Sequence, residues 1–256
     1  MRSIFDLAAP DVRRLIDASA TAVLPFGSVE QHGPHLPCGT DTMAAELVAA
    51  ELAERLDALL VPTGPFGVTP IHAGHPGTIS LDREVYERYV TNLCQELVRM
   101  GVRTLVMVNW HEGNIASLDA VATDVQARLE AMVVMAQACY VAQRLYADRG
   151  GELTHGGGIE TLAVLAHDPT LVRSERITEP SRPPGAEELD AMRRSREVYG
   201  YITDASEIAD DGWYGNPGWA TAAAAEAFAA TVATEVEDAV RRVLAVRRRR
   251  DDDRPR

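Results

Sequence analysis

Short apolar runs alternate with helical segments through the first 140 residues, and this alternation restricts the chain to few folds. Four runs are typical of strands: 21–28, 59–67, 104–109 and 131–140. The last two are apolar without interruption, as in strands that are buried on both faces. Three segments between the runs have helical spacing and strong helix formers: 41–58, 82–101 and 114–130. We therefore predict an α/β fold in which a mostly parallel sheet is covered by helices.

The second half of the sequence is less regular. Residues 156–169 begin in glycines and become helical, and 179–188 have the prolines and glycine of a loop. A glycine-rich aromatic segment then leads into one long, alanine-rich helix. We find no internal repeat and no linker, so we predict one domain over residues 1–246. Four arginines followed by three aspartates predict a charged, disordered tail over residues 247–256.

Composition excludes several classes of function. The net charge of −13 argues against a nucleic-acid partner, because phosphate binding needs a concentrated basic surface. The chain contains no lysine, so Schiff-base, pyridoxal-phosphate and Walker-type phosphate chemistry are excluded. Three scattered cysteines fit a cytoplasmic protein without a disulfide framework. No apolar run reaches the ~20 residues needed to span a bilayer, so we expect no membrane partner.

Metal-ligand side chains follow two of the predicted strands. The segment GSVEQHGPHLPCGTD (27–41) comes after the first strand, and NWHEGN (109–114) comes after the third. Ligands of open parallel sheets bind at the carboxyl ends of strands, so these segments meet at one edge. They bring five candidate side chains there: Glu30, His32, Asp41, His111 and Glu112. Histidine mixed with carboxylate is what zinc and manganese bind, and Asp41 is a candidate to bridge two ions.

The histidine pattern supports a metal site without proving it. Five of the seven histidines fall in glycine-rich segments after strands: His32, His35, His72, His75 and His111. His155 begins another glycine run, whereas the flanks of His167 predict a structural residue in a helix. A purely structural role for these histidines stays open, because scattered ligands are weaker evidence than a compact motif.

The segment LPFGSVEQHGPHLPCGTDT resembles the signature of the creatininase family of metal-dependent amidohydrolases. Four further segments are similar to family motifs in the same order: HPGTISL (75–81), VNWHEGN (108–114), THGGGIETLAVL (154–165) and YGNPGWATAAAAEAF (214–228). The resemblance spans almost the whole chain. It implies a three-layer α/β/α fold, commonly assembled as a homo-oligomer, with a hexamer favoured.

The resemblance also implies two divalent metal ions per subunit, zinc or manganese or both. Carried onto this sequence, one ion would be held by Glu30, Asp41 and His111. The other would be held by His32, Asp41 and a glutamate, with Asp41 as the bridge. His155 corresponds to the family histidine that carries a proton near the substrate.

The glutamate of the second ion is open between two positions. In creatininase the ligand lies two residues after the histidine that matches His111, and Gly113 stands there in this chain. Glu112 is one residue early and would point differently. Glu160 matches the last glutamate of the family segment HAGExET, so we favour Glu160 as the ligand. We keep Glu112, with His155, as a candidate catalytic residue that faces the substrate.

Other departures from the family motifs concern the substrate. Trp110 replaces a glycine beside His111 and either walls the pocket or packs under the loop. His75 replaces a phenylalanine, and His72 lies three residues before it. We name Trp110, His72 and His75 as candidate substrate-binding residues, although the two histidines equally fit a role in shaping the loop. The aromatic cluster of Trp213, Tyr214 and Trp219 fits packing, a lid or an intersubunit contact.

We therefore predict a metal-dependent hydrolase of a carbon–nitrogen bond in a small cyclic or polar amide. A hydroxide that bridges the metals would attack the carbonyl, and His155 would protonate the leaving nitrogen. Two alternatives within the family are a peptidase that trims a short modified precursor peptide and a formamide or lactone hydrolase. An alternative of another class is a catalytically inactive metal-binding assembly module.

Overall fold

A four-stranded parallel sheet forms the centre of the molecule. The computed structural model describes residues 2–149, 154–195 and 197–252. The strand order is β2-β1-β3-β4, with bounds Leu59–Leu60, Thr21–Phe26, Thr104–Asn109 and Met132–Gln137 in that order. Phe26 pairs with Asn109, and Asn109 pairs with Gln137, so three strands end in line. The sheet therefore presents one even carboxyl edge to the loops that follow.

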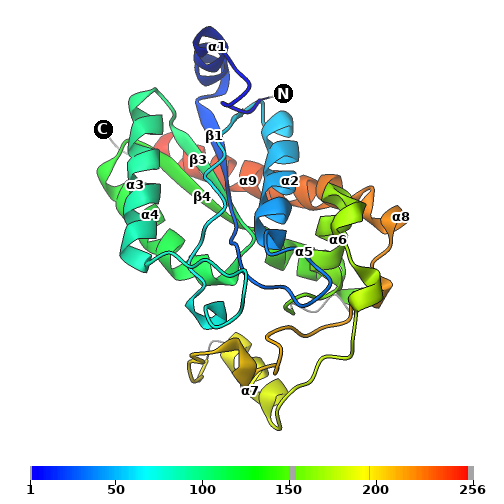
Figure 1. The fold of residues 1–256 in the computed structure, drawn as a ribbon. Helices are drawn as coiled ribbons and strands as arrows, with labels where there is room; N and C mark the ends of the chain where they lie inside the picture. Colours follow the sequence, from blue (N-terminus) through cyan, green and yellow to red (C-terminus); the bar gives the residue numbers. More distant parts are fainter. Residues whose placement is uncertain (1, 150–153, 196, 253–256) are drawn as a thin grey trace.

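Helices cover both faces of this sheet, which confirms the predicted three-layer α/β/α fold (Figure 1). One layer contains α1 (Ala9–Ser19), α3 (Arg83–Arg99) and α4 (Ile115–Arg128). The other contains α2 (Thr40–Arg55), α5 (Ala138–Leu145), α6 (Gly158–His167) and α9 (Phe228–Asp252). Alternate residues of β3 pack against the two helix layers: Leu105 packs with the first layer and Val106 with the second.

Several element boundaries differ from the prediction. The strand expected over 59–67 is only two residues long, because Pro62 and Pro65 cannot donate to a ladder. The strand expected over 131–140 ends at Gln137, where its partner strand also ends, and α5 begins at the next residue. The remaining elements are α7 (Ala186–Ser195), α8 (Ala222–Ala225) and short 3₁₀ turns at 70–72, 112–114, 147–149, 169–171, 174–176, 205–207 and 217–219.

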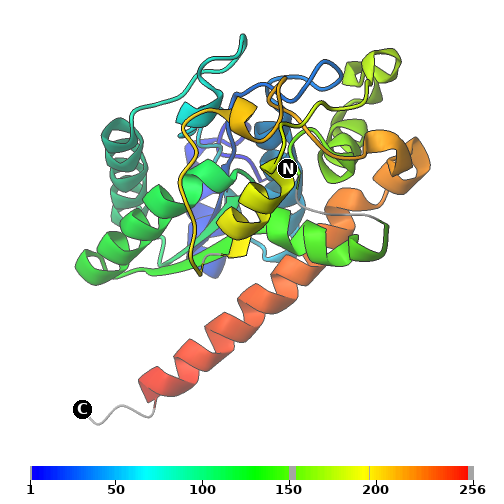
Figure 2. The same cartoon turned by 90° about the horizontal axis from the view of Figure 1, so that it is seen from below.

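The C-terminal helix extends beyond the body of the domain (Figure 2). It continues to Asp252. The disordered tail expected over residues 247–256 stays a prediction. Residues 253–256 of that tail lie outside the described residues. No helix in the described part of the chain is long and apolar enough to cross a membrane.

Two valines on one helix offer a matched test of the packing between α3 and the sheet. Val90 is fully buried and Val85 is 55% exposed. We expect Val90→Ala to lower the free energy of unfolding by about 2–3 kcal/mol, because it removes buried methyl groups and leaves a cavity. Val85→Ala should change it by less than about 0.5 kcal/mol. Urea unfolding measures both; equal effects would contradict the layer assignment of α3.

Candidate metal centre

Six predicted site residues come together at the carboxyl edge of the sheet. Glu30 and His32 lie in the loop after β1, and His111 lies two residues after the end of β3. Asp41 and Glu160 lie in the first turns of α2 and α6, while His155 precedes α6. These six side chains form three overlapping groups in which the ligand atoms lie within 4.8 Å of one another: Glu30–Asp41–His111, His32–Asp41–Glu160 and Glu30–His32–His155.

Asp41 belongs to two of these groups through different oxygens. Its Oδ2 lies 2.9 Å from His111 Nδ1, and its Oδ1 lies 3.3 Å from His32 Nε2. Glu30 Oε1 lies 3.4 Å from His111 Nδ1, and Glu160 Oε1 lies 3.7 Å from His32 Nε2. The carboxylate of Asp41 thus stands between two sets of ligand atoms, which is the arrangement that a bridging ligand needs.

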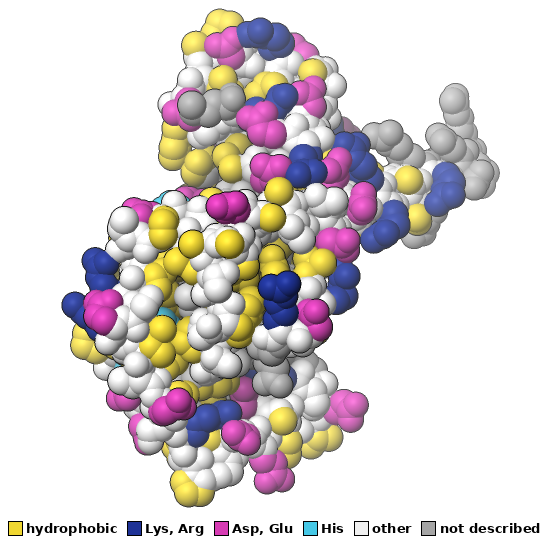
Figure 3. Space-filling model, turned by 90° about the vertical axis from the view of Figure 1, so that its right-hand side faces the viewer, with side chains coloured by type: hydrophobic (Ala, Val, Ile, Leu, Met, Phe, Trp, Pro, Cys, Tyr) yellow, Lys and Arg dark blue, Asp and Glu magenta, His cyan; other side chains and the backbone are white. Residues whose placement is uncertain are grey.

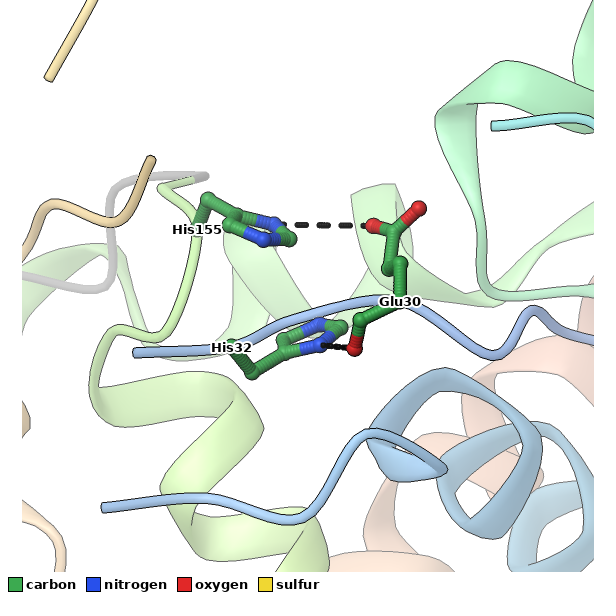
Figure 4. A group of neighbouring side chains, drawn as sticks. All are labelled: Glu30, His32 and His155. Carbon is green, nitrogen blue, oxygen red and sulfur yellow. Dashed lines mark hydrogen bonds and ion pairs between the residues drawn. The ribbon is translucent and has the colours of Figure 1, made fainter. Parts of the chain in front are cut away.

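Backbone carbonyls orient the three imidazoles. His32 Nδ1 donates to the carbonyl of Glu30 at 3.0 Å, and His111 Nε2 donates to the carbonyl of Val68 at 3.1 Å. His155 Nε2 donates to the carbonyl of Gln31 at 2.5 Å. In each ring the other nitrogen faces the carboxylates, as Figure 4 shows for His155 and Glu30. A second hydrogen bond of this kind fixes the tautomer of metal-binding histidines.

The burial of the group fits a bound cation. Glu30, His32, Asp41 and His111 are all buried. Within the described residues, Glu30 Oε2 and His32 Nε2 have no hydrogen-bond partner. Buried polar atoms rarely lack partners, because leaving them unsatisfied costs free energy. A carboxylate oxygen and an imidazole nitrogen left open in this way are both good ligands for zinc or manganese.

Protons and carboxylates balance one another within the group. Burial raises the pKa of Glu30 to about 7, against the opposing effect of His111. Burial disfavours protonated His111, but Glu30 and Asp41 outweigh it and raise the pKa of His111 to about 9. Burial likewise opposes charge on Asp41, yet His32 and His111 hold its pKa well below the usual range. Ligands must lose such protons to bind a metal, so the affinity for metal falls as pH falls.

His155 lies beside the group as a neutral imidazole. Its ring centroid is 4.2 Å from those of His32 and His72, and its Nδ1 lies 3.6 Å from Glu30 Oε1. Burial, followed by the neighbouring histidines, lowers the pKa of His155 well below its usual range. The free nitrogen of His155 therefore faces the site and is available either as a ligand or as a carrier of a proton.

Glu112 lies apart from the ligand groups. It accepts a hydrogen bond from Tyr140 Oη at 2.8 Å and faces Arg194 Nη1 at 3.2 Å. Position 113 has no room for any side chain, because a Cβ there would lie 2.2 Å from the Val68 carbonyl and 2.4 Å from His111 Nε2. In this backbone, position 113 cannot supply a carboxylate, and Glu160 supplies the carboxylate beside His32.

The site opens into a cavity of about 340 Å³. Five of the six residues line it: Glu30, Asp41, His111, His155 and Glu160. Of the candidate substrate-binding residues, Trp110 and His72 also line the cavity, whereas His75 does not. Trp110 is buried and packs edge-to-face on Phe228 at 5.8 Å, so it both walls the cavity and packs against α9.

The late aromatic residues have separate positions. Trp213 is buried against Gly33 and the ring of His35, whose Nε2 hydrogen-bonds to the Gly156 carbonyl. Tyr214 lines the cavity. Trp219 stacks on Tyr146 and occupies the space beside Gly158, where a Cβ would lie 2.1 Å from the indole nitrogen. A side chain at position 158 therefore has no room beside Trp219.

Sequence reasoning missed several side chains that support or line the site. Ser28 Oγ donates to Asp41 Oδ2 at 2.8 Å. Gln31 Nε2 contacts His72 Nδ1 at 3.1 Å and donates to the Gly212 carbonyl at 2.6 Å. Both residues lie inside the 27–41 segment, so their polar side chains in a loop expected to be buried could have indicated that they support the site. Arg193 and Arg194 of α7 line the cavity and carry no comparable signal.

Comparison with known proteins gives consistent matches. The family model Creatininase, described as creatinine amidohydrolase, matches residues 6–240. The mycofactocin precursor peptide peptidase of Mycobacterium tuberculosis (strain CDC 1551 / Oshkosh) is 32% identical over 251 residues, covering 93% of this chain and 90% of that protein. The creatinine amidohydrolase of Pseudomonas putida is 30% identical over 185 residues, covering 65% of this chain and 71% of that protein.

Solved structures share the fold. A structure named Creatininase Mn has a TM-score of 0.76 at 24% identity, covering 94% of this chain and 98% of that chain. A mutant creatininase of Zn-Zn type has a TM-score of 0.74 at 25% identity, covering 94% of this chain and 97% of that chain.

Matched glutamine substitutions distinguish the two glutamates. Glu160→Gln should lower the bound zinc or manganese per chain, because Glu160 lies with His32 and Asp41. Glu112→Gln should leave the metal content unchanged, because Glu112 faces Tyr140 and Arg194 instead. Elemental analysis after dialysis measures both. Metal loss only in the Glu112 variant would overturn the assignment.

Proposed function

The chain belongs to the creatininase family, and on that premise we propose that it hydrolyses an amide bond in a short peptide or peptide-like substrate. The chain is a hydrolase of carbon–nitrogen bonds, as its relatives are. The similarity to a peptide peptidase carries the finer proposal, since it covers 93% of this chain at 32% identity. The similarity to a creatinine amidohydrolase covers 65%.

The size of the cavity supports a substrate larger than a single small ring. Its volume of about 340 Å³ falls within the range of roughly 300–1,000 Å³ that is usual for drug-sized ligands. Residues from α7 and from the 201–214 segment extend its lining away from the metal ligands. The last two or three residues of a peptide are long enough to contact both the metal ligands and the lining from α7 and residues 201–214.

We propose that the site holds two divalent ions, zinc or manganese, with Asp41 as the shared ligand. Glu30 and His111 would complete one set, and His32 and Glu160 the other. Creatininase structures named for manganese and for a Zn-Zn type support this choice. Bound there, the ions would lower the pKa of a water molecule and polarise the substrate carbonyl.

His155 would move the proton in this reaction. Its Nε2 proton is held by the carbonyl of Gln31, so only Nδ1 exchanges a proton with the site. A neutral His155 can accept the proton that the attacking water loses. It can then deliver this proton to the leaving nitrogen, which needs one because an amide anion is a poor leaving group. Trp110 and His72 would contact the substrate from the cavity wall.

A small cyclic amide is the second candidate substrate. The 30% identity to a creatinine amidohydrolase favours it, because that relative acts on such a ring. Both candidates need the same metal ligands and the same proton carrier. They differ in how much of the cavity the substrate would fill.

Replacement of the shared ligand tests the two-ion proposal. Asp41→Ala should remove both metal ions, because both groups lose the same carboxylate. Asp119→Ala, at an exposed position of α4, is the matched control and should retain both. Metal per chain, measured by elemental analysis, reports the result. Two ions retained in the Asp41 variant would refute the bridging role.

A substrate panel tests the proposed reaction. Protein loaded with manganese or zinc is offered short peptides, creatinine, a formamide and a lactone. We expect peptide hydrolysis with a kcat/KM at least about tenfold above that for creatinine, a difference of about 1.4 kcal/mol. Chromatography of the products measures each rate. Hydrolysis of creatinine with no peptide cleaved would favour the second candidate, and no hydrolysis by metal-loaded protein would favour an inactive module.

A further inference from the structure

Positive charge is concentrated in the part of the cavity outside the metal ligands. Arg83, Arg193 and Arg194 line this part, and Glu112 is the one carboxylate among its described lining residues. This concentration contrasts with the net charge of −13 of the whole chain. It also contrasts with the outer surface seen in Figure 3, where basic and acidic side chains are interspersed. Arginine side chains gathered in one part of a cavity attract the negatively charged group of a ligand to that part.

Arg194 and Glu112 neutralise each other. Arg194 Nη1 lies 3.2 Å from each carboxylate oxygen of Glu112. Its Nε donates to Asp190 Oδ2 at 3.2 Å, and its Nη2 donates to Tyr214 Oη at 2.9 Å. Every nitrogen of this guanidinium therefore has a protein partner. The pair ties α7 to the 112–114 turn, and Glu112 Oε2 also lies 3.8 Å from Arg193 Nη2.

Arg193 retains free donors although its position is fixed. Its Nη2 and Nε donate to Asp190 Oδ1 at 2.8 and 3.3 Å, which holds the side chain in one orientation. In the described part of the chain, Nη1 of Arg193 has no hydrogen-bond partner, and the side chain is only 19% exposed. Asp190 accepts hydrogen bonds from Arg193, Arg194 and Tyr214, so its two oxygens cannot occupy all the donors of both arginines.

Arg83 adds a positive charge that is not paired with a carboxylate among the described residues. It lies at the first position of α3 and is exposed at the cavity. Among the described residues it makes no ion pair, unlike Arg99 at the other end of the same helix. An arginine without a carboxylate partner keeps its fork of N–H donors for a ligand.

We propose that Arg193 and Arg83 form a subsite for a carboxylate of the substrate, namely the free C-terminal carboxylate of a peptide. This inference rests on the proposed peptidase function. A guanidinium binds a carboxylate through two parallel hydrogen bonds, and these are stronger than bonds between neutral groups. Arg193 is already oriented by Asp190, so little side-chain entropy is lost on binding. The metal ligands and the arginines line one cavity, so one peptide contacts both.

Two peptides that differ at one group test the subsite. They share a sequence, but one ends in a carboxylate and the other in a carboxamide. Wild-type, metal-loaded protein should favour the carboxylate by about tenfold in kcat/KM, through a lower KM. Arg193→Gln and Arg83→Gln should each move this ratio toward one. Arg128→Gln, on α4 and away from the cavity, is the matched control and should keep the wild-type ratio.

The Arg83 variant distinguishes loss of the subsite from partial unfolding of the protein. Arg193→Gln breaks the contact with Asp190, so its thermal midpoint is measured beside its kinetics. Arg83→Gln has no ion pair to lose among the described residues. A ratio that stays at the wild-type value in both folded variants would overturn the subsite.

Binding separates this inference from the reaction itself. Dissociation constants for the two peptides are measured on the metal-loaded protein by calorimetry, and kcat and KM are measured for any peptide that is cleaved. If neither peptide is cleaved but the carboxylate binds about tenfold tighter, and Arg193→Gln removes that preference, the subsite stands and the peptidase proposal falls. If both peptides are cleaved with equal kcat/KM, the peptidase proposal stands and the subsite falls.

Discussion

The structure depends on one buried carboxylate that two histidines share. Asp41 lies between His32 and His111, with a different oxygen toward each. Burial of a charged carboxylate is unfavourable unless opposite charge is close by. Three elements meet that requirement together, because the loop after β1, the start of α2 and the end of β3 converge at Asp41. Protonated imidazoles can balance the charge, and so can metal ions; metal binding therefore displaces protons from the same atoms.

The sequence predicted the sheet and most of the centre because both follow from local rules. Apolar runs without interruption indicate buried parallel strands, and polar residues just after such runs indicate the carboxyl edge. The resemblance to a known family suggested Glu160 as a candidate ligand, which no spacing rule connects to residues 27–41. The short β2 and the early start of α5 were missed, because strand length depends on the partner strand as well as on composition.

The orientation of the imidazoles could not be predicted from the sequence. Each ring is set by a backbone carbonyl: that of Glu30, Val68 or Gln31. Every residue has such a carbonyl, so residue identity does not reveal which one accepts the proton. At Gly113, too, the sequence alone does not reveal what the residue does in the structure. Its missing side chain appears in the sequence as a lost ligand, whereas in the structure it is the space that the ring of His111 and the Val68 carbonyl occupy.

The cavity combines two parts with different origins in the chain. The candidate metal ligands come from segments that carry the family motifs, and these segments are tied directly to the sheet and to α6. Arg193 and Arg194 come from α7, which lies outside those motifs and covers the site from beyond the carboxyl edge (Figure 1). Substitutions in α7 can therefore alter the charge of the cavity without touching a candidate metal ligand. This separation explains why the motifs identify a hydrolase and are silent on its substrate: a function is determined by the site, and here part of the cavity lining lies on a segment that the motifs do not describe.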